Sequence, residues 1–231
     1  MDLRERRVLV VGANGVLGAG IARALRASGA QVIGTARDAE GAARLDATLD
    51  ERLLVDLTDD GSISTLATYL ASAGRGLDGI VNAAGLVGFG PATTTTASDA
   101  ALLMRVNHLG PADLITRLLP TLTASATAGH QPFVCGITGI VAERAFPGMA
   151  AYVASKSAHA AWLAALRLDV RRAGIRVLDT HPGHTETGLA TRAAFGTAPR
   201  FAAGMTPEHV VTRIVAAIRE DATELASTDF A

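Results

Sequence analysis

Short apolar runs alternate with longer segments of helical periodicity along the whole chain. The short runs are rich in Val, Ile and Leu, and several are continuously apolar, as strands covered on both faces should be. Strands that alternate with Ala- and Leu-rich helical patterns predict parallel strands joined by crossover helices. The expected strands cover residues 7–11, 31–35, 53–56, 79–82, 133–137, 176–180 and 224–227, and the expected helices cover residues 16–28, 60–73, 98–108, 111–125, 150–173 and 207–220.

This order of elements predicts an α/β protein of the Rossmann-like, doubly wound type, with a parallel seven-stranded sheet and helices on both faces. The polar stretch 91–98 and the segment 188–204 are expected to be loops over the sheet rather than linkers between domains. A chain of 231 residues can bury one full-sized core. We therefore expect residues 1–231 to form a single domain.

Composition narrows the possible classes of function. The formal net charge is -1, from 21 basic and 22 acidic residues. The chain therefore lacks the excess of positive charge that is typical of proteins that bind nucleic acid or an anionic membrane. No charge-free apolar window is long enough to span a membrane. The single cysteine, Cys135, excludes an internal disulfide and a thiolate metal site and fits a reducing, cytoplasmic location. No histidine spacing indicates zinc, so no metal is expected.

A glycine-rich turn follows the first predicted strand, in the segment V11-G12-A13-N14-G15-V16-L17-G18 that leads into a helix. Backbone amides at the start of a helix bind phosphate, and glycine permits the close approach. The alternative is a tight connection whose glycines serve packing alone. The position on the first strand of a β/α pattern favours dinucleotide binding. The expected phosphate-loop residues are Gly12, Asn14, Gly15, Val16, Leu17 and Gly18.

The end of the second predicted strand, G34-T35-A36-R37, indicates which dinucleotide binds. An acidic residue there would accept a hydrogen bond from the ribose 2′-hydroxyl, but neither Thr35 nor Ala36 is acidic. Arg37 offers a forked cation suited to a 2′-phosphate. It could otherwise be a solvated residue paired with Asp38 or Glu40. The pattern favours NADP(H), with NAD(H) as the alternative.

A tyrosine and a lysine at helical spacing, Tyr152 and Lys156, are the strongest candidates for chemistry. On a helix they lie one turn apart on the same face. Lys156 is the only lysine among 21 basic residues, which an ordinary surface role explains poorly. A nearby ammonium can lower the pKa of a phenol and bring it into range for acid-base catalysis.

Six segments together resemble the short-chain dehydrogenase/reductase family, over essentially the whole chain. They are V11-G12-A13-N14-G15-V16-L17-G18, D56-L57-T58, N82-A83-A84-G85, V106-N107-H108-L109-G110, Y152-V153-A154-S155-K156 and P182-G183-H184-T185-E186-T187. The resemblance implies an oxidoreductase that interconverts a carbonyl and an alcohol by exchanging hydride with a nicotinamide. It also implies a homodimer or homotetramer formed through helices near residues 112–125 and 150–173.

The resemblance further implies roles for individual residues. Tyr152 would exchange a proton with the substrate, Lys156 would bind the ribose and tune Tyr152, and Asn107 would position a water in a proton relay. An alternative for Asn107 is a helix residue satisfied by backbone groups. The remaining implied cofactor contacts are Asp56 and Leu57 at the adenine, Asn82, Ala83, Ala84 and Gly85 as support, and Pro182, Gly183, Thr185 and Thr187 at the nicotinamide end.

The chain departs from the family pattern at three places. Val11 and Val16 replace a Thr and a Gly of the usual phosphate loop, and Ala83 replaces an Asn. The third departure affects catalysis, because Gly139 stands where the family has a Ser 13 residues before the Tyr. We hypothesise that the neighbouring Thr138 supplies that hydroxyl as a donor to the substrate oxygen. Alternatively, water fills the position and the enzyme is slow or specialised.

Two other functions remain open. Loss of the Ser favours a catalytically weakened protein that binds NADP(H) as a sensor or scaffold, whereas an epimerase or dehydratase could use the same Tyr and Lys without net cofactor turnover. The substrate is a small molecule that the sequence does not identify. The segment 188–204 carries Leu189, Phe195 and Phe201 with Arg192 and Arg200, which suggests an apolar substrate with an acidic group.

Overall fold

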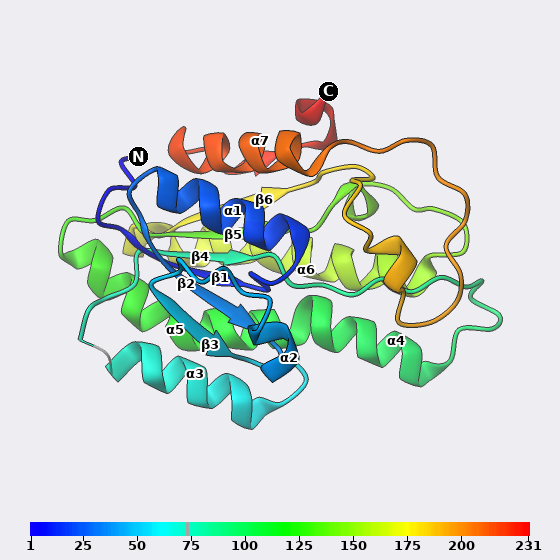
Figure 1. Cartoon of the computed structure of the whole chain (residues 1–231), viewed down its shortest axis with the longest axis horizontal. Coiled ribbons are helices and arrows are strands. Elements are labelled where there is room, and N and C mark those ends of the chain that lie inside the picture. Colours follow the sequence, from blue (N-terminus) through cyan, green and yellow to red (C-terminus); the bar gives the residue numbers. More distant parts are fainter. Residues whose placement is uncertain (73) are drawn as a thin grey trace.

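The computed structural model describes residues 1–72 and 74–231. Its seven strands form one parallel sheet in the order β3-β2-β1-β4-β5-β6-β7 (Figure 1). The strand order reverses direction between β1 and β4, which confirms the predicted doubly wound sheet. The strands are β1 (Arg7–Val11), β2 (Gln31–Ala36), β3 (Glu51–Leu54), β4 (Gly79–Asn82), β5 (Phe133–Ile137), β6 (Arg176–Thr180) and β7 (Glu224–Leu225).

Helices cover both faces of the sheet (Figure 1). Helices α1 and α7 pack together on one face, and α3, α5 and α6 pack on the other. No helix in the described ranges 1–72 and 74–231 is long and apolar enough to cross a membrane. The α-helices are α1 (Val16–Ala27), α2 (Ala39–Ala42), α3 (Asp60–Ser72), α4 (Ala97–Met104), α5 (Gly110–Thr127), α6 (Ala150–Val170) and α7 (Pro207–Arg219), joined by a π-helical turn at Arg105–Leu109 and by 3₁₀ turns at Ile140–Ala142, Arg171–Ala173, Ala190–Arg192 and Ser227–Phe230.

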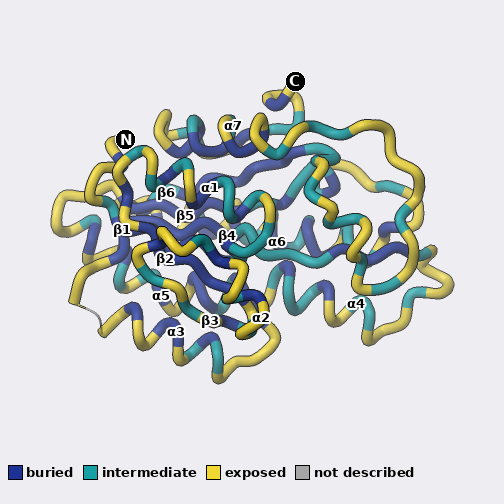
Figure 2. Tube along the Cα trace, viewed as in Figure 1, coloured by how far each residue is buried: buried dark blue, intermediate teal, exposed yellow. Residues whose placement is uncertain are grey.

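The sheet is buried on both faces, as Figure 2 shows by the dark strands at the centre of the molecule. Val8 and Val10 of β1 point into the core beneath α1 and α7, whereas Leu9 and Val11 point into the core beneath α3, α5 and α6. Successive side chains of a strand alternate between faces, so a strand between two cores must be apolar at every position. This explains the continuous apolar runs of the sequence.

Strand β3 begins and ends two residues earlier than the predicted 53–56. The chain leaves the sheet there because the carboxylate of Asp56 accepts hydrogen bonds from the backbone N–H and the hydroxyl of Thr58, at 2.8 and 2.7 Å. Strand β7 ends after two residues rather than four. Ser227 instead begins a 3₁₀ turn, and its N–H and hydroxyl both donate to Glu143.

The helices predicted at 98–108 and 111–125 form one continuous helical segment from α4 to α5, joined by the π turn. The start of α4 carries a capping box between Thr96 and Asp99, which fixes that boundary. In the π turn the N–H of Gly110 donates to the carbonyl of Arg105. Pro111 follows and has no N–H, so it cannot donate the α-helical hydrogen bond to the carbonyl of Asn107. The sequence indicated a break here because proline and glycine usually end helices.

Candidate active site

A cleft of about 1290 Å³ opens at the carboxyl ends of the central strands. Its walls include residues that directly follow β1, β2, β4, β5 and β6, together with α6 and the segment after β6. In open parallel sheets, this edge next to the point of strand reversal is where ligands bind. Of the predicted site residues, Asn82 and Asn107 do not line the cleft, and all the others do.

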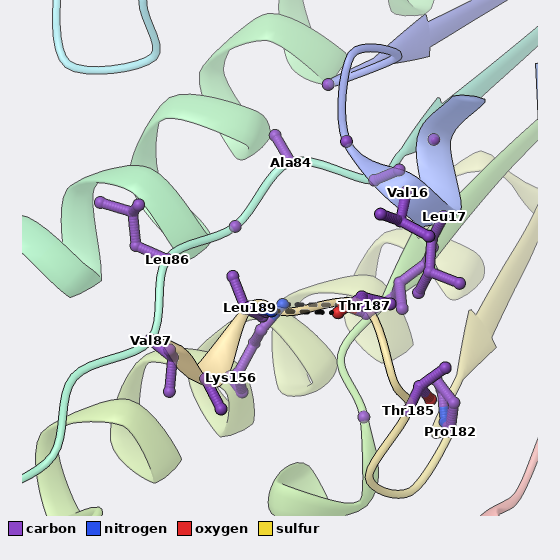
Figure 3. A pocket seen from close by; sticks show the side chains of 18 of the residues that line it. Val16, Leu17, Ala84, Leu86, Val87, Lys156, Pro182, Thr185, Thr187 and Leu189 are labelled. Atoms are coloured by element: carbon purple, nitrogen blue, oxygen red, sulfur yellow. Dashed lines mark hydrogen bonds between the residues drawn. The ribbon is translucent and has the colours of Figure 1, made fainter. Parts of the chain in front are cut away.

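One end of the cleft is formed by the turn between β1 and α1. Gly15 precedes α1, no side chain caps the helix, and its first turn carries no acidic residue. The first amides of a helix have no intrahelical partner, so this end favours an anion. A Cβ at Gly18 would lie 2.2 Å from the carbonyl oxygen of Gly12, which explains why glycine is required there. In Figure 3, Val16 and Leu17 lie on the opposite side of the view from Leu86 and Val87.

Two arginines line the cleft beyond the end of β2. Arg37 is paired with Asp38 at 3.0 Å, as the alternative interpretation of the sequence expected, yet 69% of its side chain is exposed. Asp38 also caps α2 by accepting from the N–H of Gly41. Arg44, which sequence analysis missed, lies one turn beyond the start of α2 and pairs with Glu40 at 2.7 Å. It was missed because α2 is too short to show helical periodicity.

The middle of the cleft contains Asp56 and Leu57 on one side and Ala83, Ala84 and Gly85 on the other. The Asp56 carboxylate accepts from the N–H and the hydroxyl of Thr58 within its own turn. Asn82 is buried behind this surface, and its Oδ1 has no hydrogen-bond partner among the described residues. Asn82 is therefore not part of the cleft wall, whereas the residues that follow it are.

Tyr152 and Lys156 lie one turn apart on α6, and both line the cleft. The ammonium Nζ of Lys156 donates to the carbonyl oxygen of Ile137 at 2.8 Å. Burial lowers the pKa of Lys156 to about 8, an effect that the negative charge of Asp179 partly offsets. Burial raises the pKa of Tyr152 to about 12. Burial is the cause of this rise, so the lowering of the Tyr152 pKa expected from Lys156 is not observed.

Asn107 is 1% exposed and lies in the π turn behind the cleft. Its Oδ1 accepts from the N–H of Leu86 at 2.8 Å, and its Nδ2 donates to the carbonyl of Leu86 and to the hydroxyl of Ser155, each at 2.9 Å. The side chain thereby ties the segment after β4 to α6. Both N–H donors of the amide are used in these bonds, and its oxygen accepts one, which agrees with the alternative interpretation of a satisfied helix residue.

The structure does not support Thr138 as a donor to the substrate. Its side chain is 0% exposed, and the hydroxyl donates to Oδ1 of Asp179 at 2.7 Å, within the fold. Gly139 follows with φ +80 and ψ 165, a left-handed backbone that a side chain adopts only under strain. This backbone turns the chain into the 3₁₀ turn, so the hydroxyl of Thr138 stays on the strand side.

The far end of the cleft is apolar. Val87, Phe89, Val141 and Met149 form a small buried cluster there. The segment 188–204 closes over it, and the N–H of Phe89 donates to the carbonyl of Phe195, so the segments after β4 and β6 run side by side (Figure 1). Other members of this wall are Ile140, Phe146, Tyr152 and Leu189.

Polar groups are few at this apolar end. Arg192 lines the cleft but donates to the carbonyls of Gly188 and Thr187, while Arg200 is not among the lining residues. Arg144, which sequence analysis missed, lies over the ring of Phe146 at 5.1 Å. In the segment after β6, the N–H of Leu189 donates to Oγ1 of Thr187 at 3.3 Å (Figure 3). This bond orders the turn between the two residues.

The chain resembles known proteins over most of its length. Residues 6–195 match the family model described as short chain dehydrogenase. The dehydrogenase/reductase SDR family member 7B of Mus musculus is 26% identical, over 99% of this chain and 75% of its own.

Two solved structures share the fold. A short chain dehydrogenase from Burkholderia cenocepacia in complex with NADP matches with a TM-score of 0.84 at 22% identity, over 98% of this chain and 89% of its own. The 3-ketoacyl-(acyl-carrier-protein) reductase from Brucella melitensis complexed with NADH matches with a TM-score of 0.86 at 21% identity, over 99% of this chain and 100% of its own.

Proposed function

The chain belongs to the short-chain dehydrogenase family, and from that premise we propose that it reduces a carbonyl to an alcohol with NADP(H), with Tyr152 as the general acid. Membership supports an oxidoreductase that acts on a carbonyl/alcohol pair with a nicotinamide dinucleotide. The proposed role of Tyr152 rests on one observation. Tyr152 and the lone Lys156 lie one turn apart in the cleft, which also contains the uncapped start of a helix.

The residues present fit a nicotinamide dinucleotide. The uncapped start of α1 suits a pyrophosphate, and the backbone of Ala83, Ala84 and Gly85 offers a surface without bulky side chains. The turn from Pro182 to Thr187, which follows β6, also lines the cleft. When bound, the cofactor supplies the hydride that reduces the carbonyl carbon.

The protonation states favour reduction. With a pKa of about 12, the phenol of Tyr152 is protonated at neutral pH and can donate its proton to the carbonyl oxygen as the alcohol forms. Lys156 uses one of its three N–H donors on Ile137, which leaves two for the ribose hydroxyls. Its positive charge stabilises the phenolate that Tyr152 becomes after donating its proton.

The preference for NADP(H) rests on Arg37 and Arg44. Both line the cleft beyond β2, where a 2′-phosphate would lie, and each now pairs with a carboxylate at the surface. Exposed ion pairs contribute little stability, so a phosphate can recruit these cations at low cost. Of the carboxylates, Asp38 lies two residues beyond the end of β2 and caps α2 by accepting from the N–H of Gly41.

A second candidate function is favoured by the missing donor at Gly139. Without a hydroxyl from that position, Tyr152 is the principal donor to the substrate oxygen, because Thr138 bonds to Asp179. A protein that binds NADP(H) but turns it over slowly would serve as a sensor or scaffold. An epimerase or dehydratase would use Tyr152 and Lys156 without net cofactor oxidation.

We also propose a homodimer or homotetramer in a reducing, cytoplasmic compartment. The outer side of α6 exposes Leu168 to 73%, and Leu109 before α5 is 46% exposed, which supports contacts between copies through these helices. Cys135 is free and buried, so no disulfide is required for the fold.

Titration of the purified protein with NADPH and NADH, followed by oxidation of the bound cofactor against a panel of apolar aldehydes and ketones, tests the proposal. We expect NADPH to bind more tightly than NADH and to be oxidised, and Tyr152→Phe to bind NADPH normally without oxidising it. Tight binding with no oxidation by the wild type across the panel would favour the sensor.

A further inference from the structure

A buried carboxylate lies beneath the active site and takes no part in the mechanism above. Asp179 belongs to β6 and is 4% exposed. Its Oδ1 accepts from the hydroxyl of Thr138 at 2.7 Å, and its Oδ2 lies 3.6 Å from Nε2 of His181. Nδ1 of His181 lies 3.2 Å from the same Thr138 hydroxyl. The three side chains form a compact polar cluster between β5 and β6.

This cluster faces α6, the helix that carries Lys156. Val177 of β6 points into the core beneath α6, so Asp179 and His181 point the same way by the alternation of a strand. Gly136 of β5 makes room for them, since a Cβ there would lie 2.4 Å from Leu163 of α6 and 3.7 Å from Oδ1 of Asp179. The carboxylate and the inner side of α6 thus share one small space.

Lys156 extends from α6 to the end of β5, next to Thr138 of this cluster. Its Nζ donates to the carbonyl of Ile137, whose peptide bond continues into Thr138, the residue that donates to Asp179. Lys156 is itself 7% exposed, so its charge is largely removed from water. A buried ammonium stays charged only where an opposite charge or hydrogen bonds compensate the lost hydration.

We propose that Asp179 is a positioning residue, whose buried carboxylate keeps the ammonium of Lys156 charged at the cofactor-binding edge of the sheet. The proposal rests on the proposed function for its catalytic consequence, but the electrostatic relation itself concerns the protein alone. Thr138 takes part by donating its hydroxyl to Asp179, which favours the ionised carboxylate. This gives the inward-facing Thr138 a role different from the one expected from the sequence.

The charged groups around Lys156 and Asp179 are consistent with the proposed role of Asp179. Burial lowers the pKa of Lys156, and the negative charge of Asp179 partly offsets this. Burial also raises the pKa of Asp179 above its ordinary value, and the charge of His181, the hydroxyl of Thr138 and the charge of Lys156 oppose that rise by favouring the ionised carboxylate. On α6, His159 is buried beside Lys156, and burial together with the Lys156 charge lowers the pKa of His159 to about 3, so it is neutral. Glu224 on β7 lies 3.9 Å from Nε2 of His181, and the charge of His181 helps to lower the pKa of Glu143 after the 3₁₀ turn. Cys135 of β5 is buried on the opposite face of the sheet, beneath α1 and α7.

A carboxylate in this position is not needed for packing. Burying an ion pair commonly contributes no more to stability than apolar side chains of similar volume. The other residues of β6 that point into the two cores include Val177 and Leu178, which are apolar. The contact of Asp179 with Thr138 and its influence on Lys156 are therefore the features that an apolar residue would remove.

The single lysine makes a direct test possible. In protein labelled with [13Cε]lysine and purified without a lysine-bearing tag, Lys156 gives the one labelled signal, and its pKa follows from an NMR titration without cofactor or substrate. We expect the wild type to titrate near pH 8. Asp179→Asn, which keeps the shape and removes the charge, should lower this pKa by about one unit or more. The control is Glu224→Gln, which removes a 60% exposed acid near His181 and should leave the pKa unchanged.

An unchanged or higher pKa of Lys156 in folded Asp179→Asn would overturn the proposal. If Asp179→Asn does not fold, as judged by its thermal unfolding and amide spectrum, Thr138→Val provides the test. Loss of the hydroxyl should lower the pKa of Lys156 by less than Asp179→Asn would, and an unchanged pKa would overturn the proposal. Because no substrate is needed, this result is independent of whether the protein reduces carbonyls. In an active enzyme, the alkaline limb of kcat/KM should move to lower pH with the same variants.

Discussion

The ammonium of Lys156 donates to the carbonyl of Ile137 at 2.8 Å. Ile137 is the last residue of β5, so this bond ties the middle of α6 to the carboxyl edge of the sheet. The lysine is thereby oriented toward the cleft before any cofactor binds. A group that is already in place loses little conformational freedom when a ligand arrives, which favours binding and catalysis.

The affinity for NADPH should fall as the pH rises through about 8. Burial lowers the pKa of Lys156 in the folded protein to about 8, so its charge is present below that pH and is lost above it. A neutral lysine binds ribose hydroxyls less strongly, and we expect about tenfold weaker binding at pH 9.5 than at pH 7. Calorimetric titration measures this. Lys156→Met should bind weakly at both pH values, and a pH-independent affinity of the wild type would contradict the account.

Arg37→Gln should reduce the preference for NADPH. Loss of a charged donor to the 2′-phosphate should raise the Kd of NADPH by about 10- to 100-fold and that of NADH by less than about twofold. Arg52→Gln is the matched control, because Arg52 is exposed on β3 outside the cleft. Equal loss of both cofactors in Arg37→Gln would show that Arg37 acts on the fold and not on the phosphate.

Gly139→Ser, which restores the residue usual in the family, should destabilise the protein. Position 139 has φ +80 and ψ 165, a conformation that is essentially restricted to glycine, and a residue with a Cβ there costs about 1–3 kcal/mol. The free energy of unfolding in urea measures the effect. Ala145→Ser, at an exposed position nearby, should change stability by less than about 0.5 kcal/mol. A Gly139→Ser protein as stable as the wild type would show that the backbone there is not restrictive.

Asn107→Ala should destabilise the fold more than Ser155→Ala. The amide of Asn107 makes three hydrogen bonds, two that are partly buried to the backbone groups of Leu86 and one that is buried to Ser155. Loss of all three, with two backbone groups left unpaired, should cost about 2–4 kcal/mol, whereas Ser155→Ala should cost about 1 kcal/mol. Thermal unfolding followed by circular dichroism compares the two. Similar losses for both variants would mean that the bonds to Leu86 contribute little.

The sheet could be predicted from sequence because its strands lie between two cores. Short, continuously apolar runs such as residues 8–11 and 133–135 are typical of strands covered on both faces, and the strands β1, β4, β5 and β6 begin and end where expected. The ends of β3 and β7 differ because Asp56 and Ser227 form hydrogen bonds that interrupt the pattern. Such bonds depend on local geometry and, for Ser227, on Glu143 far away in the chain.

Site residues could be predicted from the sequence where their spacing along a single helix or turn is enough to bring them together. Tyr152 and Lys156 share a helix face, and the residues from Gly12 to Gly18 share a turn. The orientation of Thr138 was not predictable, because it depends on Asp179, which lies 41 positions along the chain. Asn107 likewise bonds to Leu86 and Ser155 through a π turn, for which the sequence carries no periodic signal.

Transfer of deuterium from NADPH that carries deuterium at both hydrogens of C4 of the nicotinamide to a carbonyl compound, followed by mass spectrometry of the alcohol, tests the central claim most directly. The wild type should place the label on the former carbonyl carbon. Tyr152→Phe should bind NADPH with unchanged affinity and form labelled alcohol at least about 100-fold more slowly, because the proton donor is lost. Labelled alcohol formed by Tyr152→Phe at the wild-type rate would contradict the role of Tyr152, and unlabelled alcohol from the wild type would contradict hydride transfer from the cofactor.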